Sequence, residues 1–268
     1  MKTIRLLLFA FILSGFGFIN IHAQDSHTDI IPVGSTLKKL SSNQFRFTEG
    51  PVWYRDSVLL FTNEGPIICY DPVANKFGNW PNHSGGCNGL TCDRAGNLIG
   101  CSSNILMMNT AGKVIQVLAS LYNGKRFNNP NDLIADDKGG VYFTDPDFFV
   151  STPPQGITAV YYIDSTRIVT RVIDGLAKPN GLVLSPDGTR LYVVDSDNKY
   201  VYSWDVAADG SVSGKLSLAE LQTTGGIASG ADGMAIDTHG NIYVTSIMGI
   251  QVFSPQGDSI TRANAFKF

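Results

Sequence analysis

The 268-residue chain carries little charge of either sign. Only 16% of its residues are charged, and 20 Lys and Arg against 23 Asp and Glu give a formal net charge of −3. Without an excess of basic residues there is no positive field to attract nucleic acid or an anionic membrane surface, so we expect neither as a partner. With 28 glycines and 43% hydrophobic residues, the composition predicts a compact, turn-rich fold rather than disorder.

Cysteine is also scarce. The four cysteines, Cys69, Cys87, Cys92 and Cys101, fall within 33 residues, and none has a C-x-x-C or Cys/His spacing typical of zinc sites. A disulfide could form if the protein is exported from the cell, as the N-terminal residues discussed below predict. Cys92 and Cys101 fall on adjacent predicted strands, but the spacing of the cysteines does not define which of them would pair. We interpret the four as small buried side chains in preference to a bridge.

Sustained helical periodicity is missing, as are the signatures of two common enzyme classes. No Gly-x-Ser-x-Gly elbow occurs, so serine hydrolase chemistry is not indicated. No glycine-rich phosphate loop follows a strand and opens a helix, so nucleotide binding is not indicated either. Runs rich in Val, Ile, Tyr and Leu between turn residues predict an all-β fold.

The N-terminus predicts export. Residues 1–5 are basic, the stretch Leu6–Ala23 has no charged residue, and Gln24 begins a polar stretch. This pattern predicts a signal peptide over residues 1–23, a flexible segment over 24–34, and a periplasmic or secreted protein. An uncleaved membrane anchor is the alternative, because 18 uncharged residues nearly span a bilayer. After cleavage we expect no membrane association, and the sequence does not indicate an oligomeric state.

One short phrase recurs five times in the remaining sequence. Each copy begins with an oxygen-bearing side chain and continues into an apolar strand, and four copies then run through a turn into a second strand. Repeats of about 40–50 residues with four strands each are typical of β-propellers, so we predict a propeller domain over residues 35–268. The opening residues are Glu49, Asn88, Asn131, Asn180 and Asp232, at spacings of 39, 43, 49 and 52 residues.

The fourth repeat shows the predicted blade most clearly, with a tight turn at Pro186-Asp187-Gly188 between its first two strands. Its four expected strands are Leu182–Ser185, Arg190–Val194, Tyr200–Asp205 and Gly214–Glu220.

The two ends of the repeat array do not match a closed ring of complete blades. The fifth repeat shows three strands, and a lone strand is expected at Ser35–Leu40, where it would belong to a closing blade. Either a five-bladed ring closes in another way, or the sequence is truncated within a closing blade. We favour truncation, because an open propeller would expose a strand edge. The three strands of the fifth repeat are Met234–Ile236, Asn241–Thr245 and Ile250–Phe253.

Equivalent positions of a propeller converge on its axis, so the opening residues predict a metal site. Glu49, Asn131, Asn180 and Asp232 would offer two carboxylates and two amide oxygens, which suit Ca²⁺. No His or Cys occupies the register, which argues against zinc, although Zn²⁺, Mg²⁺ and Mn²⁺ remain alternatives. Asn and Asp before glycine are also ordinary turn residues, and that interpretation would suffice for any single copy. Asn88 is the weakest candidate.

The repeat phrases resemble one known family. They are Glu49–Trp53, Asn129–Asp132, Phe143–Pro146, Pro179–Gly188 and Asp232–Met234. Together they are similar to the gluconolactonase family, which includes senescence marker protein and luciferin-regenerating enzyme, over about residues 45–257. The resemblance implies a six-bladed propeller of four-stranded blades with a divalent metal, usually calcium, at the mouth of the channel. It assigns the metal ligands to Glu49, Asn131, Asn180 and Asp232.

The same resemblance implies a function. It predicts an exported, metal-dependent, gluconolactonase-like hydrolase that opens a sugar lactone, with Ca²⁺ polarising the carbonyl and Asp232 activating water or acting as the nucleophile. Asn129, Asn131 and Arg126 would bind the lactone or sugar acid; some family members carry Arg at the position of Asn129. A non-catalytic, calcium-stabilised propeller that binds a sugar or a protein partner is the alternative, and organophosphate hydrolysis is a third. We interpret Asp145, which ends a second strand, as structural.

Overall fold

The computed structural model describes residues 30, 38–41, 44–80, 86–226 and 228–263. The chain divides into residues 1–39 and a compact unit, Leu40–Phe268. The predicted signal peptide lies outside the described residues, as does all of the segment 24–34 except Ile30. In the described part of the chain, no helix has the length and apolar character needed to cross a membrane.

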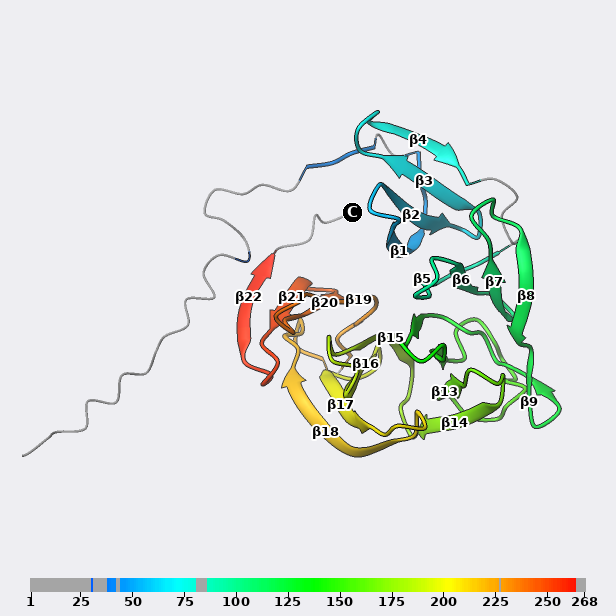
Figure 1. Ribbon diagram of the computed structural model, residues 1–268. Coiled ribbons are helices and arrows are strands. Elements are labelled where there is room, and N and C mark those ends of the chain that lie inside the picture. The colour runs from blue at the N-terminus through cyan, green and yellow to red at the C-terminus, as the bar shows by residue number, and fades with distance from the viewer. Residues whose placement is uncertain (1–29, 31–37, 42–43, 81–85, 227, 264–268) are drawn as a thin grey trace, which may run out of the picture. The chain divides into compact units, whose positions relative to one another are not determined.

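The described residues of the unit Leu40–Phe268 form five four-stranded antiparallel sheets, each made of consecutive strands. Figure 1 shows these sheets, which we call blades 1 to 5, arranged as the blades of a propeller with the first strand of each innermost. A short hairpin, β9 (Leu121–Tyr122) and β10 (Lys125–Arg126), lies between blades 2 and 3 in the sequence. The blades are blade 1, β1 (Thr48–Tyr54), β2 (Val58–Asn63), β3 (Ile67–Asp71) and β4 (Lys76–Asn79); blade 2, β5 (Leu90–Cys92), β6 (Leu98–Cys101), β7 (Ile105–Met108) and β8 (Val114–Ala119); blade 3, β11 (Leu133–Ala135), β12 (Val141–Asp145), β13 (Ala159–Ile163) and β14 (Val169–Asp174); blade 4, β15 (Pro179–Leu184), β16 (Arg190–Asp195), β17 (Tyr200–Val206) and β18 (Val212–Glu220); and blade 5, β19 (Met234–Ile236), β20 (Ile242–Ser246), β21 (Gly249–Phe253) and β22 (Ser259–Ala263).

The hydrophobic core lies between consecutive blades rather than at the axis. Alternation along β12 shows why: Val141 and Phe143 pack toward blade 2, whereas Tyr142 between them packs toward blade 4. Successive side chains of a strand point to opposite faces, so each central strand contributes to two cores. A further cluster on blade 1, centred on Phe61 and Ile68, packs with Phe45 and contains no residue of another blade. Because the apolar side chains pack between the blades, the residues that face the axis are not needed for the hydrophobic core and can be polar.

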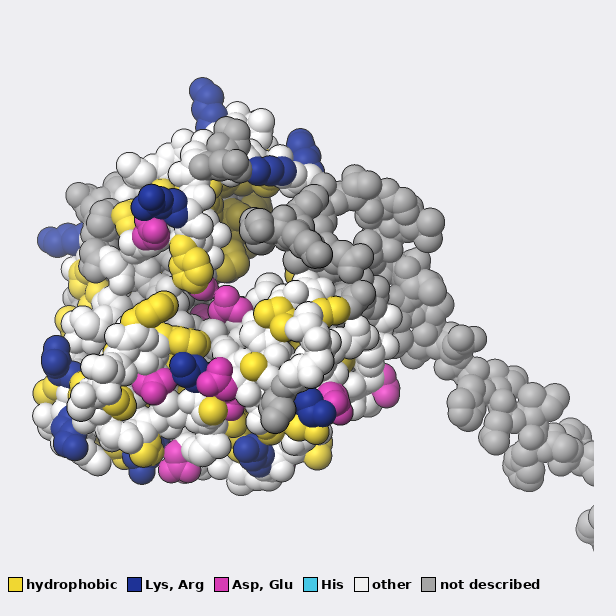
Figure 2. Space-filling view, turned by 180° about the vertical axis from the view of Figure 1, so that it is seen from behind, with side chains coloured by type: hydrophobic (Ala, Val, Ile, Leu, Met, Phe, Trp, Pro, Cys, Tyr) yellow, Lys and Arg dark blue, Asp and Glu magenta, His cyan; other side chains and the backbone are white. Residues whose placement is uncertain are grey.

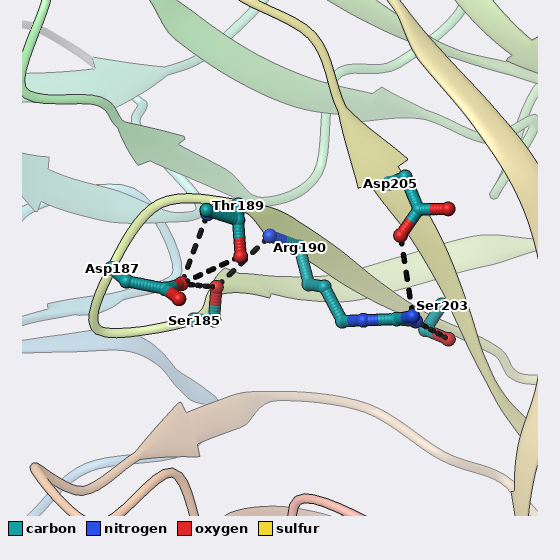
Figure 3. A network of polar contacts seen from close by, with 6 residues as sticks. All are labelled: Ser185, Asp187, Thr189, Arg190, Ser203 and Asp205. Atoms are coloured by element: carbon teal, nitrogen blue, oxygen red, sulfur yellow. Dashed lines mark hydrogen bonds and ion pairs between the residues drawn. The ribbon is translucent and has the colours of Figure 1, made fainter.

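The turn between β15 and β16 forms where the sequence predicts it. Figure 3 shows the Asp187 carboxylate accepting hydrogen bonds from the Ser185 hydroxyl at 2.6 Å and from the backbone N–H and hydroxyl of Thr189. These bonds, the Ser185 bond first, lower the pKa of Asp187 to about 2. Gly188 has a φ of +68°, a left-handed conformation that residues with a Cβ atom adopt less easily. Arg190 then continues into β16 and pairs with Asp205 on β17 at 3.2 Å.

Several predictions about the strands are confirmed and others are wrong. The four strands of the fourth repeat appear within three residues of the predicted bounds. The fifth repeat has a fourth strand, β22, which the sequence did not predict, and Lys38–Leu40 form no strand, while residues 35–37 lie outside the described residues. The described residues therefore form five complete blades rather than the predicted six, because each of the five repeats builds one sheet of its own.

The interpretation of the cysteines as small buried side chains is confirmed for Cys87 and Cys101, whereas Cys69 and Cys92 are only half-buried. No disulfide occurs in the part of the chain that is described; Cys101 is fully buried in the core between blades 2 and 3. It acts there as a small packing residue.

Candidate functional site

The five opening residues of the repeats line one cavity. Glu49, Asn88, Asn131, Asn180 and Asp232, one from each blade or from the loop that leads into it, surround a space of about 500 Å³. The predicted convergence of equivalent positions is therefore observed. Figure 2 shows a hollow among the blades with acidic side chains inside it and hydrophobic side chains around its rim.

Threonines on the second strands hold these inner segments in place. The Thr62 hydroxyl donates to the backbone carbonyls of Glu49 and Asn88, at 3.3 and 2.9 Å, and so connects blades 1 and 2. Thr144 on β12 and Thr245 on β20 make the corresponding bonds to the inner segments of their own blades. The repeated Thr thus fixes the backbone from which the opening side chains project.

Glycine after the opening residue lets neighbouring blades approach closely. A Cβ atom on Gly181 would lie 2.3 Å from the backbone oxygen of Asp232, and one on Gly89 would lie 2.8 Å from that of Asn131. Both glycines instead donate their N–H to those oxygens at 2.9 Å. Neither these glycines nor the preceding Asn88 and Asn180 adopt a positive φ, so at these positions the left-handed turn interpretation of the Asn-Gly pairs is wrong. Close backbone contact is the reason for glycine.

The electrostatics of the cavity favour a bound cation. Burial, together with the nearby carboxylates of Asp232 and Asp132, raises the pKa of Glu49 to about 8. Burial likewise raises the pKa of Asp132 to about 7 and that of Asp232 above its usual value. Among the described residues no Lys or Arg lines the cavity, so these carboxyl groups have no cationic side chain to balance them there.

The amide of Asn180 is held with its oxygen available. Its Nδ2 donates to the Ser196 hydroxyl at 3.1 Å, and that hydroxyl donates to the backbone oxygen of Ala231 at 2.6 Å. A hydrogen bond from Asn180 also lowers the pKa of Asp232, against the larger effect of burial. Since the nitrogen is engaged, Oδ1 is the atom left to accept from, or coordinate, a ligand.

This donor set fits a hard divalent cation. Glu49 and Asp232 supply carboxylate oxygens, and Asn131 and Asn180 supply amide oxygens on the same cavity. No group of three or more His, Cys, Asp or Glu side chains gathers to hold a metal within the described ranges, so coordination here would depend on the two amides. Such a set suits Ca²⁺ better than zinc, which favours nitrogen and sulfur. The ligand roles stay a prediction.

Of the predicted substrate-binding residues Asn129 and Arg126, the structure places only the first at the cavity. Asn129 lines the cavity, whereas Arg126 lies exposed on β10 and does not line it. The buried Asp145 carboxylate accepts the backbone N–H groups of Asn128 and Asn129 at 2.9 and 2.8 Å. Asp145 therefore holds the loop that presents Asn129, as its structural interpretation predicted.

Two features in and beside the cavity were missed in the sequence, the first of them behind its lining. Asp132 occupies the position that is glycine in the other four repeats, and its carboxylate approaches the backbone of Gly89. The replacement of the repeated glycine by Asp132 was the signal in the sequence that could have indicated an additional carboxylate here. Three phenylalanines, Phe47, Phe148 and Phe149, also line the cavity; they fall outside the repeat phrase, and nothing in its register indicated them.

Fold and cavity together define a β-propeller with an acidic, amide-bearing site where its inner strands converge. The chain belongs to the SMP-30/gluconolactonase/LRE-like family, whose characteristic region it matches over residues 47–265. A gluconolactonase from Zymomonas mobilis is 29% identical over 270 residues, which cover 86% of this chain and 73% of that protein.

Solved structures with the same fold include relatives of this family. The gluconolactonase XC5397 from Xanthomonas campestris superposes with a TM-score of 0.72 at 25% identity, covering 83% of this chain and 77% of its own. Regucalcin from Agrobacterium tumefaciens, a calcium-binding protein, shares the fold with a TM-score of 0.69 at 20% identity, covering 84% and 77%.

Proposed function

We propose that this protein is a lactone hydrolase that works with a divalent cation bound in the axial cavity. The observation that carries the proposal is the gathering of Glu49 and Asp232 with the amides of Asn131 and Asn180 on one cavity. Membership of a family that includes gluconolactonases supports the reaction class, because a relative at 29% identity is a gluconolactonase. A sugar lactone is accordingly the substrate we propose.

Ca²⁺ is the cation we propose, and its contribution when bound would be to polarise the lactone carbonyl and stabilise the developing oxyanion. Glu49, Asn131, Asn180 and Asp232 are the residues that would hold it. The calcium-binding regucalcin with the same fold supports this choice of ion. A cation would also keep the Glu49 and Asp232 carboxyl groups ionised at neutral pH, against the effect of burial.

Asp232 is the residue we assign to the chemical step. Its carboxylate, oriented by the hydrogen bond from Asn180, would take a proton from the attacking water, or would itself attack the carbonyl. In the first route one carboxylate oxygen accepts the proton and later returns it to the leaving ring oxygen. In the second route the ring C–O bond would break as the bond to Asp232 forms, the ring oxygen would take a proton from solvent, and water would then hydrolyse the acyl bond to release the acid and restore Asp232. Asn129, on the same cavity, would bind a hydroxyl group of the substrate.

Export to the periplasm or the cell exterior is part of the proposal and rests on the N-terminal sequence pattern. A small-molecule lactone reaching that compartment would meet the enzyme there.

The test is the Asp232→Asn variant, assayed for lactone opening at saturating Ca²⁺. The amide keeps an oxygen for the cation but accepts no proton at neutral pH, so we expect turnover to fall about 100- to 10,000-fold. Asp174→Asn, an exposed carboxylate at the outer edge of blade 3, is the matched control and should retain activity. Near wild-type turnover by Asp232→Asn would remove Asp232 from the mechanism. A wild-type protein that opens no lactone would support the alternative of a non-catalytic binding propeller.

A further inference from the structure

Three aromatic side chains lie at the cavity with much of their surface uncovered. Phe149 is fully exposed, Phe47 is 59% exposed and Phe148 is half-buried, and all three line the same cavity as Glu49 and Asp232. A single exposed apolar side chain needs no explanation, but several gathered at one cavity mark a binding surface.

The loop that carries Phe148 and Phe149 is fixed in position. Asn129, which also lines the cavity, donates its Nδ2 to the backbone oxygen of Phe148 at 3.0 Å. The Lys178 ammonium lies 5.2 Å from the centre of the Phe148 ring and occupies one of its faces. The rings of Phe148 and Phe149 are 6.4 Å apart and tilted by 42°. The loop thus presents two rings to the cavity from an anchored backbone.

The conformation of Phe149 adds to this argument. Its φ is +60°, a left-handed value that costs free energy for a bulky residue and that Gly or Asn would adopt more easily. A fully exposed aromatic ring gains no burial that would offset this cost within the folded protein. A ligand that covers the ring would supply the missing contact.

Size and charge of the cavity indicate what that ligand is. A volume of about 500 Å³ lies within the range for sites that bury drug-sized ligands, larger than a single six-membered lactone. The carboxylates and amides form its polar part, and the lining among the described residues includes no Lys or Arg, although Lys178 lies beside it over the Phe148 ring. The aromatic side suits a flat ring with an apolar face.

We propose that the substrate is a lactone that carries a second ring beyond the reacting one, and that this ring packs against Phe148 and Phe149, in the cavity that Phe47 also lines. The inference rests on the proposed lactone hydrolysis and names the substrate class for the same site. Two chemistries share the required feature: a second sugar ring, which presents a face of C–H groups, and an aryl group. Either would leave the lactone carbonyl at the polar part of the cavity.

The experiment measures kcat/KM for three probes: glucono-δ-lactone with one ring, cellobiono-δ-lactone with a second sugar ring, and a phenyl-substituted δ-lactone. For the wild type we expect about a tenfold higher value with at least one two-ring probe, a factor equivalent to about 1.4 kcal/mol. The preferred probe identifies which kind of ring the site takes.

Variants then test the aromatic contact. In Phe149→Ala and Phe47→Ala we expect the preference for the two-ring probe to fall about tenfold, mainly through a higher KM. In Phe149→Leu the preference should fall nearly as much, because leucine has no ring face on which the second ring could stack. Trp53→Ala is the matched control: Trp53 is 52% exposed on β1 but does not line the cavity, so its loss should leave the preference unchanged. Equal thermal unfolding midpoints would show that the variants are folded.

The two proposals fail in different ways. A wild type that opens none of the three lactones contradicts the proposed function. A wild type that opens glucono-δ-lactone but shows no preference for either two-ring probe overturns the inference about the second ring and leaves lactone hydrolysis standing. Equal losses on all three probes in Phe149→Ala would overturn it as well.

Discussion

Replacing Glu49 by Gln should stabilise the metal-free protein at alkaline pH, although it removes a proposed ligand. In the folded protein the pKa of Glu49 is raised from its ordinary 4.5 to about 8, first by burial and then by the charges of Asp232 and Asp132. Between these two pH values the folded state binds a proton that the unfolded state has lost. The stability of the wild type therefore falls as pH rises from about 4.5 to 8.

The magnitude follows from the size of this pKa change. At about 1.4 kcal/mol per pH unit, raising the pKa from 4.5 to about 8 corresponds to roughly 4–5 kcal/mol, reached only above pH 8. Gln has nearly the shape of the protonated acid and carries no charge, so Glu49→Gln avoids this loss. The two proteins should be about equally stable at pH 5, and the variant should be more stable by a few kcal/mol at pH 9.

Calcium should narrow this difference in stability at pH 9. A ligand that binds only the folded state stabilises it by about 2.7 kcal/mol at 100 times its Kd, and the wild type should gain this while Glu49→Gln gains less. Urea denaturation of both proteins at pH 5, 7 and 9, in EDTA and in excess Ca²⁺, measures how the free energy of unfolding depends on pH and on the cation. Glu220→Gln, which removes an exposed partner of Lys199, is the control and should change stability by less than about 1 kcal/mol at every pH.

A Glu49→Gln variant that is less stable than the wild type at pH 9 in EDTA would refute the electrostatic reasoning. Equal stabilisation of both proteins by Ca²⁺ would refute the assignment of Glu49 as a ligand. Because these outcomes are independent, the experiment separates the burial of the carboxyl from its role toward the cation.

Two further predictions concern the backbone at the axis and the N-terminus. Gly181→Ala would place a Cβ 2.3 Å from the backbone oxygen of Asp232 and should destabilise the protein by at least about 1–3 kcal/mol, whereas Gly78→Ala, with nothing within 4 Å, should be tolerated; denaturant midpoints compare them. Protein recovered from the exporting host should lack residues 1–23 by intact-mass analysis. Recovery of the uncleaved chain in a membrane fraction would instead support the anchor alternative.

The repeats alone determined the blades, because each blade is a run of local hairpins. The turn at Pro186-Asp187-Gly188 and the strands on either side of it are specified by neighbouring residues, so the bounds of the fourth blade were predicted to within three residues. The register of the repeats also identified Glu49, Asn131, Asn180 and Asp232 as residues that meet, since equivalent positions of a propeller share one axis. Strand β22 was missed because it has weak alternation of its own and is defined by pairing with β21.

Only the tertiary structure decided which other residues share the cavity and how their charges interact. Arg126 is close to Asn131 in sequence, yet it lies on the β9–β10 hairpin and does not line the site. Phe47, which precedes β1, and Phe149, which lies between β12 and β13, line one cavity. The raised pKa of Glu49 depends on burial and on carboxylates far away in sequence. Distances across the axis and exclusion of water are properties of the assembled blades, and no local pattern of residues encodes them.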